Sequence, residues 1–331
     1  GVRLSKAFRE IRSKPVAAAS LSQVHHATLR DGREVALKIQ RPGIREQVLG
    51  DLETLGEIAS FLQGHSDVGR RYDVAVLFEE FRKSMLRELD FRQEAMHLVT
   101  IGRSLRDIPE IIIPQPVLDY STSRVLTMDF LAGTKITEIP PVAMTELDGT
   151  RLVDALFRAY LKQMLRDGMF HADPHPGNVL LVGKCIGMID LGMVAQISPG
   201  LQDRLLQLLL AIGDSRSAEA VRALYLIGEC HEDADRKGFE RAVADLIEQN
   251  REMARQRPQV GRTVLMLLKV AAAHGVRLPP ELAMIGKTLL NLDRIGQTLA
   301  PDFDPNAAIR RHSADITEDQ VTRDFSIGSF F

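Results

Sequence analysis

The chain has 331 residues, of which 45% are hydrophobic and 26% charged, and its formal net charge is −2. This is enough apolar material for a globular core in one large or two medium domains. The small net charge and the lack of a run of basic residues argue against a nucleic-acid-binding protein. The two cysteines, Cys185 and Cys230, fit neither a disulfide framework nor a zinc motif.

The hydropathy pattern argues against a membrane span. No segment reaches the roughly 18 uninterrupted apolar residues that a spanning helix needs, and residues 1–10 lack the apolar stretch of a signal peptide. We therefore expect a cytoplasmic protein, with peripheral attachment at the inner face of a membrane as the open alternative.

The first part of the chain predicts a small mixed domain over residues 1–134. Residues 15–41 alternate apolar and polar side chains around Asp31-Gly32, a pair typical of a hairpin turn. Apolar residues then repeat every three or four positions over 45–63 and 74–102, which predicts two helices. β-branched runs within 111–133 predict two more strands.

After a proline-rich joint, residues 135–331 predict a larger, mainly helical domain. A helix over 151–168 should end at Gly168, a typical helix stop. Two short strands are expected within 178–192, and the periodicity predicts about five helices between residues 200 and 295. The polar stretch 301–324 is expected at the surface, extended or helical.

Polar residues with the spacing of a phosphoryl-transfer site follow the helix that ends at Gly168. In "HADPHPGN", Asp173 stands five residues before Asn178, and Asp190 follows twelve residues later. Phosphoryl transfer needs one carboxylate to orient the nucleophile, and an amide and a second carboxylate to hold Mg²⁺ on the phosphate oxygens. Asp173 is therefore the candidate catalytic residue, and Asn178 and Asp190 are the candidate metal ligands.

The first predicted domain contains a lysine that could bind the phosphates of a nucleotide. Lys38 lies within the apolar strand "EVALKIQ", where a kinase lysine contacts the ATP phosphates and pairs with an acidic residue of a following helix. Glu88 is the first candidate for that acid. Glu94 is the second candidate, on the neighbouring face of the same predicted helix. A solvated surface lysine is the simpler alternative.

These motifs together resemble the UbiB-type atypical protein kinase-like family, also called the aarF-domain or coenzyme Q biosynthesis kinase family. The matching segments are "VAAASLSQVH" (16–25), "VALK" (35–38), "ELDFRQEA" (88–95), "FHADPHPGN" (170–178) and "IDLG" (189–192), and the likeness runs from about residue 14 to about residue 295. The resemblance implies an α+β, two-lobed protein-kinase-like fold with ATP or ADP and Mg²⁺ in the cleft. It also implies a small mixed β/α N-lobe and a large, mainly helical C-lobe.

An alanine-rich stretch stands where kinases have a glycine-rich loop. Because alanine disfavours the positive-φ turns that glycine allows, this loop should be stiffer. The resemblance implies ATPase activity with poor phosphorylation of proteins, and nucleotide-binding positions at Val16, Ala17, Ala18, Ala19, Ser20, Leu21, Ser22, Gln23 and Val24.

A second difference from ordinary protein kinases concerns the binding of the substrate. The chain returns to a helical pattern within about ten residues of Asp190 and has no A-P-E segment, so a small or lipidic substrate, or water, is favoured over a protein. The family's K-x-G-Q motif is not found in residues 1–14. His171 and His175 are expected to support their loop by hydrogen bonds, and a zinc site made with Asp173 is disfavoured.

Three functions remain open from the sequence. The first is an atypical kinase or ATPase that supports ubiquinone and isoprenoid-quinone biosynthesis or lipid homeostasis, with quinone precursors, membrane lipids or quinone-biosynthesis enzymes as partners. The second is a small-molecule phosphotransferase resembling aminoglycoside or choline kinases. The third is a nucleotide-sensing, lipid-binding scaffold with little catalysis.

Overall fold

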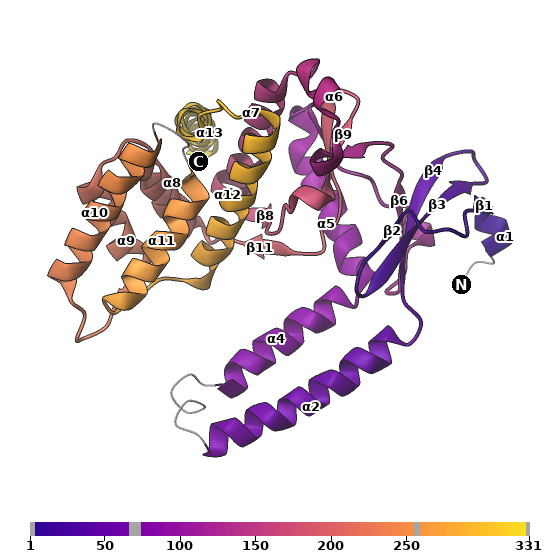
Figure 1. Ribbon diagram of the computed structural model, residues 1–331, viewed down its shortest axis with the longest axis horizontal. Helices are drawn as coiled ribbons and strands as arrows, with labels where there is room; N and C mark the ends of the chain where they lie inside the picture. Colours follow the sequence, from indigo (N-terminus) through magenta and orange to yellow (C-terminus); the bar gives the residue numbers. More distant parts are fainter. Residues whose placement is uncertain (1–3, 66–73, 255–258, 329–331) are drawn as a thin grey trace. The chain divides into compact units, whose positions relative to one another are not determined.

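The computed structural model describes residues 4–65, 74–254 and 259–328 (Figure 1). The chain divides into two compact units. The first contains the described residues up to Thr100 together with Pro114–Leu131, and the second contains Ile101–Ile113 and the described residues from Ala132 onward. The segment Ile101–Ile113 thus groups with the mainly helical unit, whereas the sequence predicts it within the first domain.

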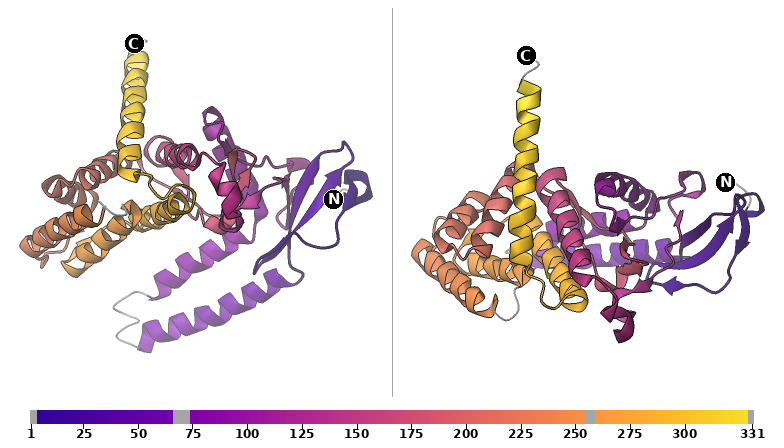
Figure 2. Two further views of the ribbon diagram at one scale, coloured as in Figure 1. Left: turned by 45° about the horizontal axis from the view of Figure 1, so that its top comes forward. Right: turned by 90° about the horizontal axis from the view of Figure 1, so that it is seen from above.

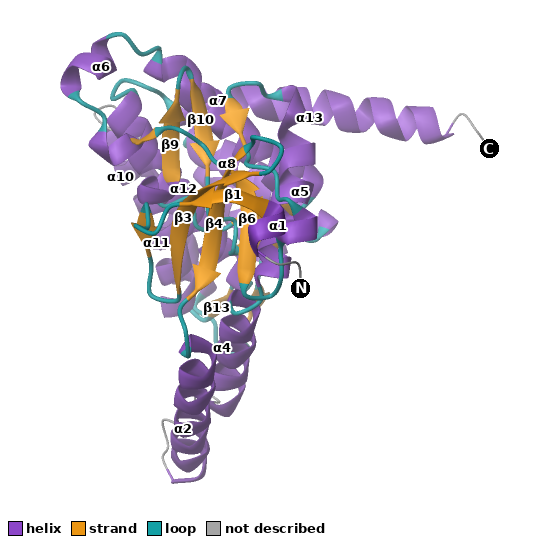
Figure 3. Cartoon of the chain, turned by 90° about the vertical axis from the view of Figure 1, so that its right-hand side faces the viewer, coloured by secondary structure: helices purple, strands orange, loops and turns teal. Residues whose placement is uncertain are grey.

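The first unit contains an antiparallel sheet with strand order β1-β3-β4-β6 and β2 paired to β3 (Figure 3). The predicted hairpin is confirmed: β3 and β4 pair antiparallel, and Gly32 has a φ of +91° in the turn between them. The strands are β1 (Phe8–Ile11), β2 (Ala17–Ala18), β3 (Ser22–Leu29), β4 (Glu34–Gln40) and β6 (Val125–Asp129), and the short helix α1 (Leu4–Ala7) precedes them.

The helices that follow β4 differ from the prediction. The sequence predicts one helix over 74–102, but the structure breaks it at Leu89 and Asp90 into α4 (Val74–Glu88) and α5 (Phe91–Ser104). The side-chain amide of Gln40 donates a hydrogen bond of 2.8 Å to the Leu89 carbonyl, and Asp90 accepts one of 3.1 Å from the Arg92 N–H. A long-range contact and a local cap therefore satisfy the groups that the break exposes. The predicted helix over 45–63 is α2 (Ile44–His65), which packs along α4 (Figure 2).

Within the described residues, the second unit contains two small sheets and one further strand pair. One has the order β5-β10-β9-β7, and the other pairs β8 with β11. The sequence predicts β9 and β10 correctly, whereas β8 and β11 have three residues each and are too short for a periodic pattern. The strands are β5 (Ile111–Ile112), β7 (Thr134–Lys135), β8 (Met169–His171), β9 (Val179–Val182), β10 (Cys185–Met188) and β11 (Val194–Gln196), with a separate pair, β12 (Glu229–Cys230) and β13 (Val276–Arg277).

Helices make up most of this unit, and α7 is at its core. Helix α7 begins after Asp148, whose carboxylate accepts a hydrogen bond from the Arg151 N–H at 3.1 Å, and it continues into a π-helical turn that ends at Gly168 with a φ of +68°. The five helices predicted between residues 200 and 295 are confirmed. The helices are α6 (Pro141–Thr145), α7 (Gly149–Lys162), α8 (Pro199–Gly213), α9 (Ser217–Ile227), α10 (Arg236–Ala254), α11 (Val260–Ala273), α12 (Pro280–Leu299) and α13 (Pro305–Gly328). Among the described residues, no helix is both long and apolar enough to cross a membrane.

Helices α11 and α12 cross closely at Gly261. A Cβ atom at this position would lie 2.0 Å from the backbone nitrogen of Leu290, so only glycine fits. The closeness lets Asp293 of α12 accept a hydrogen bond of 2.9 Å from the Gly261 N–H at the start of α11. Asp293 is only 5% exposed. Burial raises its pKa to about 7, although the N–H groups of Gly261 and Val260 oppose this shift.

This carboxyl predicts a pH-dependent stability. Because its pKa is higher in the folded than in the unfolded chain, ionisation destabilises the fold, and stability declines as pH rises from about 4 to about 7. The free energy of unfolding of the wild type, relative to Asp293→Asn, should fall by about 4 kcal/mol over this range. Urea unfolding of both proteins at pH 4, 6 and 8 measures the difference, and a difference that does not change with pH would contradict the assignment.

Candidate functional site

The alanine-rich stretch forms a tight turn between β2 and β3. Ala17 and Ala18 pair with Val24 and Gln23, and the Val16 N–H donates to the Val24 carbonyl at 2.8 Å. No described non-glycine residue of this turn has a positive φ, in keeping with its alanines. The predicted nucleotide-binding positions from Val16 to Val24 are thus one continuous hairpin.

Two backbone amides at the tip of this hairpin are available to a ligand. Within the described residues, the N–H groups of Ser20 and Leu21 donate no hydrogen bond, whereas the Ala19 N–H donates to the Ser22 carbonyl at 2.8 Å. The Arg41 side chain fixes the tip by donating to the Ala19 carbonyl at 3.0 Å. Successive free amides in a turn favour an anion such as phosphate.

Lys38 forms a buried ion pair within the first unit. It lies on β4 between Val24 of β3 and Leu126 of β6. Its Nζ donates to both carboxylate oxygens of Glu94, at 2.9 and 2.8 Å. The side chains of Lys38 and Glu94 are 13% and 4% exposed, so the simpler alternative of a solvated surface lysine is wrong.

The carboxylate of this pair is Glu94 of α5, which corrects the first choice of Glu88. Glu88 is the last residue of α4, before the break that the sequence does not predict. Glu94 lies on the buried face of α5, which also carries Phe91, Ala95 and Leu98. A glutamate inside an apolar stripe of helical spacing was the signal that could have selected it.

In the second unit, two strand pairs bring the candidate catalytic and metal-binding residues together. The pairing of β8 with β11 places His171 opposite Val194, and the Ala172 N–H donates to the Met193 carbonyl at 3.0 Å. Asp173 therefore follows β8 next to the segment that links Asp190 to β11.

The hairpin of β9 and β10 brings Asn178 next to Asp190. Val179 pairs with Met188, and the next residue, Ile189, donates its N–H to the Asn178 carbonyl at 3.0 Å. The Asn178 Nδ2 then lies 3.4 Å from the Asp190 Oδ2. Asp190 has a φ of +64°, a left-handed conformation that is uncommon outside glycine and is often found at functional sites.

The chemistry of these two side chains fits magnesium bound together with phosphate. Carboxylate and amide oxygens are hard ligands, and Mg²⁺ usually takes one or two carboxylates, substrate phosphates and water rather than a full protein cage. Within the described parts of the chain, no three His, Cys, Asp or Glu residues gather as a metal site. Asn178 and Asp190 would thus supply part of the coordination, as the sequence predicts.

His175 bonds to the backbone of the loop and His171 to the backbone of the neighbouring segment, which confirms their predicted supporting role. The Nδ1 of His171 lies 3.2 Å from the Met193 carbonyl oxygen. The Nδ1 of His175 accepts a hydrogen bond of 3.1 Å from the Gly177 N–H. The His175 N–H donates to the Asp173 carbonyl at 2.7 Å, so the loop is closed by local bonds.

Helix α12 supplies contacts to Asp173 that the sequence does not predict. The Lys287 Nζ lies 3.1 Å from the Asp173 Oδ1, and the Asn291 amide donates to the same oxygen at 3.3 Å. Thr288 donates its hydroxyl to the Ala172 carbonyl at 3.0 Å. Because residues four apart share one helix face, Lys287 and Asn291 fix one carboxylate oxygen together. The sequence signal is a set of polar residues at helical spacing among the apolar residues of α12.

Helix α7 supports the loop from its buried side. The Gln163 Oε1 accepts a hydrogen bond of 3.1 Å from the His171 N–H, and Gln163 begins the π-helical turn; such turns are frequent at functional sites. Burial first, and the negative charge of Asp173 second, raise the pKa of the Tyr160 hydroxyl well above its ordinary value. Tyr160 therefore stays neutral and forms an uncharged wall beside the loop.

Two models of known protein families match successive segments of this chain. Residues 1–224 match the ABC1 atypical kinase-like domain, and residues 243–304 match the UbiB helical domain. The chain belongs to the ABC1/UbiB family of atypical kinase-like proteins. The residues of α12 that hold Asp173 fall in the UbiB helical domain, whereas Asp173 itself falls in the ABC1 domain.

Relatives in the ABC1/UbiB family share about a third of the residues. "Probable protein kinase UbiB" of Azotobacter vinelandii is 30% identical over 92% of this chain and 58% of that protein. "Protein ACTIVITY OF BC1 COMPLEX KINASE 7, chloroplastic" of Arabidopsis thaliana is 30% identical over 92% of this chain and 44% of that protein. The chain thus spans about half the length of these relatives.

A solved structure supports the same fold. Rv3197 of Mycobacterium tuberculosis, in a structure described as its complex with erythromycin, matches with a TM-score of 0.67 and 26% identity, covering 92% of this chain and 81% of that one. The expected α+β, protein-kinase-like fold, with a small mixed part and a large helical part, is thereby confirmed.

Proposed function

We propose that this chain binds ATP with Mg²⁺ and hydrolyses it or transfers its terminal phosphoryl group. The turn from Val16 to Val24 and Lys38 would bind the nucleotide phosphates, and Asn178 and Asp190 would hold the metal. The buried ion pair of Lys38 with Glu94, at 2.8 Å, carries this proposal, because kinases hold their phosphate-binding lysine in the same way.

Asp173 would act on the nucleophile. Lys287 and Asn291 both contact its Oδ1, so Oδ2 is the oxygen left to accept a hydrogen bond from water or an alcohol and to take its proton. When bound, Mg²⁺ would neutralise charge on the phosphate oxygens. The protein's contribution is then to orient the nucleophile and to hold the phosphates.

The short connection after Asp190 supports a small substrate. Only β11 (Val194–Gln196) stands between Asp190 and the start of α8 at Pro199, which leaves little chain for the long segment on which kinases lay a peptide. We therefore propose water, a small molecule or a lipid as acceptor. The family resemblance supports a role in isoprenoid-quinone biosynthesis or lipid homeostasis, with quinone precursors, membrane lipids or quinone-biosynthesis enzymes as partners.

Release of phosphate from ATP by the purified chain, with and without an added acceptor, tests this proposal. Phosphate release with Mg²⁺ alone supports an ATPase, and transfer to choline or an aminoglycoside supports the small-molecule phosphotransferase alternative. Nucleotide-dependent binding to liposomes without any turnover would support the scaffold and reject the catalytic proposal.

Lys287 offers a specific prediction for the catalytic step. Lys287→Met should lower kcat about tenfold and change the KM for ATP less than about twofold, because the ammonium orients Asp173 without touching the nucleotide in this proposal. Lys287→Arg should restore most of the rate. Steady-state kinetics measure both values, and Lys269→Met, an exposed lysine on α11, is the control. A rise in KM with unchanged kcat would reject the positioning role.

A further inference from the structure

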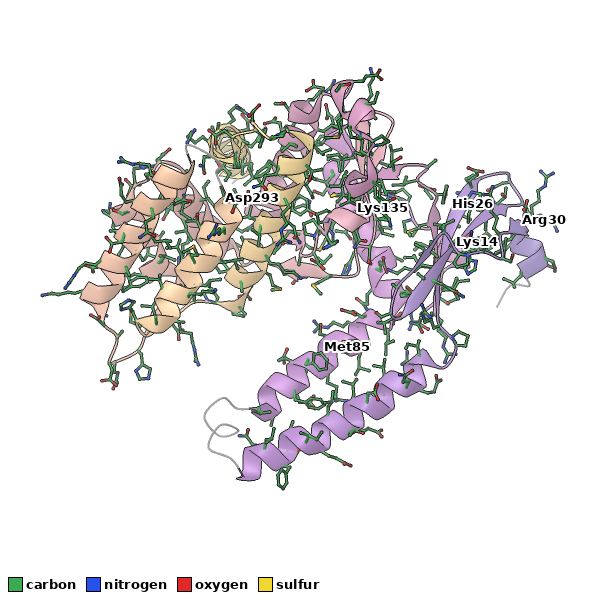
Figure 4. All side chains as sticks on the ribbon, viewed as in Figure 1. Lys14, His26, Arg30, Met85, Lys135 and Asp293 are labelled. Carbon is green, nitrogen blue, oxygen red and sulfur yellow. The ribbon has the colours of Figure 1, made fainter. Side chains whose placement is uncertain are left out.

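A cavity of about 320 Å³ lies within the second unit, away from the residues that contact Asp173. Its walls include Phe157 of α7, Asp293 and Gln297 of α12, and Phe303, which follows α12. Asn291 contacts the catalytic loop, whereas Asp293 contacts the start of α11, so the two residues lie on different faces of α12. Figure 4 labels Asp293 on this helix. The volume is within the range of small-molecule sites.

Asp293 is the chemically distinctive part of this cavity. Its Oδ2 accepts the hydrogen bond from the Gly261 N–H. Its Oδ1 is buried and has no hydrogen-bond partner among the described residues. A buried carboxylate oxygen without a donor is unfavourable and rare in folded proteins. A ligand that brought an N–H donor would satisfy it once a shift of the side chain turned this oxygen toward the cavity.

Two aromatic side chains of the wall can pack against an apolar body. The Phe157 side chain is buried in the core, and its ring centroid lies 5.3 Å from that of Phe303, with the ring planes tilted by 39°. Aromatic rings supply apolar contact area, and their faces also attract cations. Within the described residues, no lysine or arginine is part of this wall, so the protein itself does not neutralise Asp293 there.

We propose that this cavity is a binding site for a small organic amine with an apolar body. The ammonium group would donate to Asp293, and the apolar part would pack against Phe157 and Phe303. This inference does not depend on the proposed function, because none of these residues belongs to the nucleotide, metal or catalytic set.

Calorimetric titration of the whole chain at pH 8 with 4-phenylbutylamine and with 4-phenylbutan-1-ol tests this proposal. The two probes share one apolar body and differ in charge. The wild type should bind the amine at least about tenfold more tightly than the alcohol, because a charge-assisted hydrogen bond is stronger than a neutral one. In Asp293→Asn the two affinities should differ less than about twofold.

Two further variants complete the test. Asp302→Asn removes a nearby exposed charge and should keep the preference for the amine. Phe303→Ala should weaken both probes by a similar factor, which gives an independent measurement if Asp293→Asn does not fold. Absence of saturable binding, equal affinities for the two probes in the wild type, or an amine preference that persists in a folded Asp293→Asn would each overturn the proposal.

Discussion

Asp173→Asn should lower the rate of ATP turnover about 10²- to 10⁴-fold, while the affinity for nucleotide changes less than about threefold. The asparagine keeps the size of the side chain and can still accept a hydrogen bond from Asn291, which donates to Asp173 at 3.3 Å. It cannot take a proton from the nucleophile. The loss should therefore fall on the chemical step rather than on binding.

Phosphate release and nucleotide titration of the same preparations measure the two effects separately. Asp203→Asn is the matched control, because Asp203 is an exposed aspartate on α8 and should leave both values unchanged. Equal turnover by wild type and Asp173→Asn would remove Asp173 from the catalytic role and leave nucleotide binding as the only activity to explain.

The second large effect is expected at Glu94. Glu94→Gln removes the negative charge that pairs with the ammonium of Lys38, which is 13% exposed, and removing one partner of such a pair costs about 3 kcal/mol or more. Lys38 should also lose its fixed position, so the affinity for ATP should fall at least about tenfold. Hydrogen exchange of the β4 amides reports the stability of the first unit, and nucleotide titration reports the affinity.

Glu88→Gln is the control that separates the two glutamates. Glu88 ends α4 and is partly exposed, so its replacement should cost less than about 1 kcal/mol and leave ATP affinity nearly unchanged. If the Glu88 variant lost stability and affinity and the Glu94 variant did not, the assignment of the ion pair to Glu94 would be wrong.

The sequence predicts best those features that local chemistry determines. The turn at Asp31-Gly32, the helix stop at Gly168 and the proximity of Asn178 to Asp190 all depend on neighbours close in sequence. The β9–β10 hairpin brings the last pair together within twelve residues. Short-range patterns are therefore sufficient for the metal-binding part of the candidate site.

Contacts between distant segments determine what the sequence does not predict. The helix break at Leu89 depends on Gln40, 49 residues away, and it shifts the ion pair of Lys38 from Glu88 to Glu94. The contact of Asn291 with Asp173 joins residues 118 positions apart. Periodicity shows which face of a helix is buried but not which loop lies against it. The contacts of α12 with Asp173 can therefore be seen only in the folded structure.

The central claim is that this chain binds ATP through a magnesium ion held by Asp190. Calorimetric titration of ATP into the wild type and into Asp190→Asn, each with excess Mg²⁺ and with a chelator, tests it most directly. The wild type should bind ATP at least about tenfold more tightly with Mg²⁺ than without it, and the variant should lose this difference because its amide lacks the negative charge. An affinity of the wild type that does not depend on Mg²⁺, or one that responds equally in both proteins, would contradict the account.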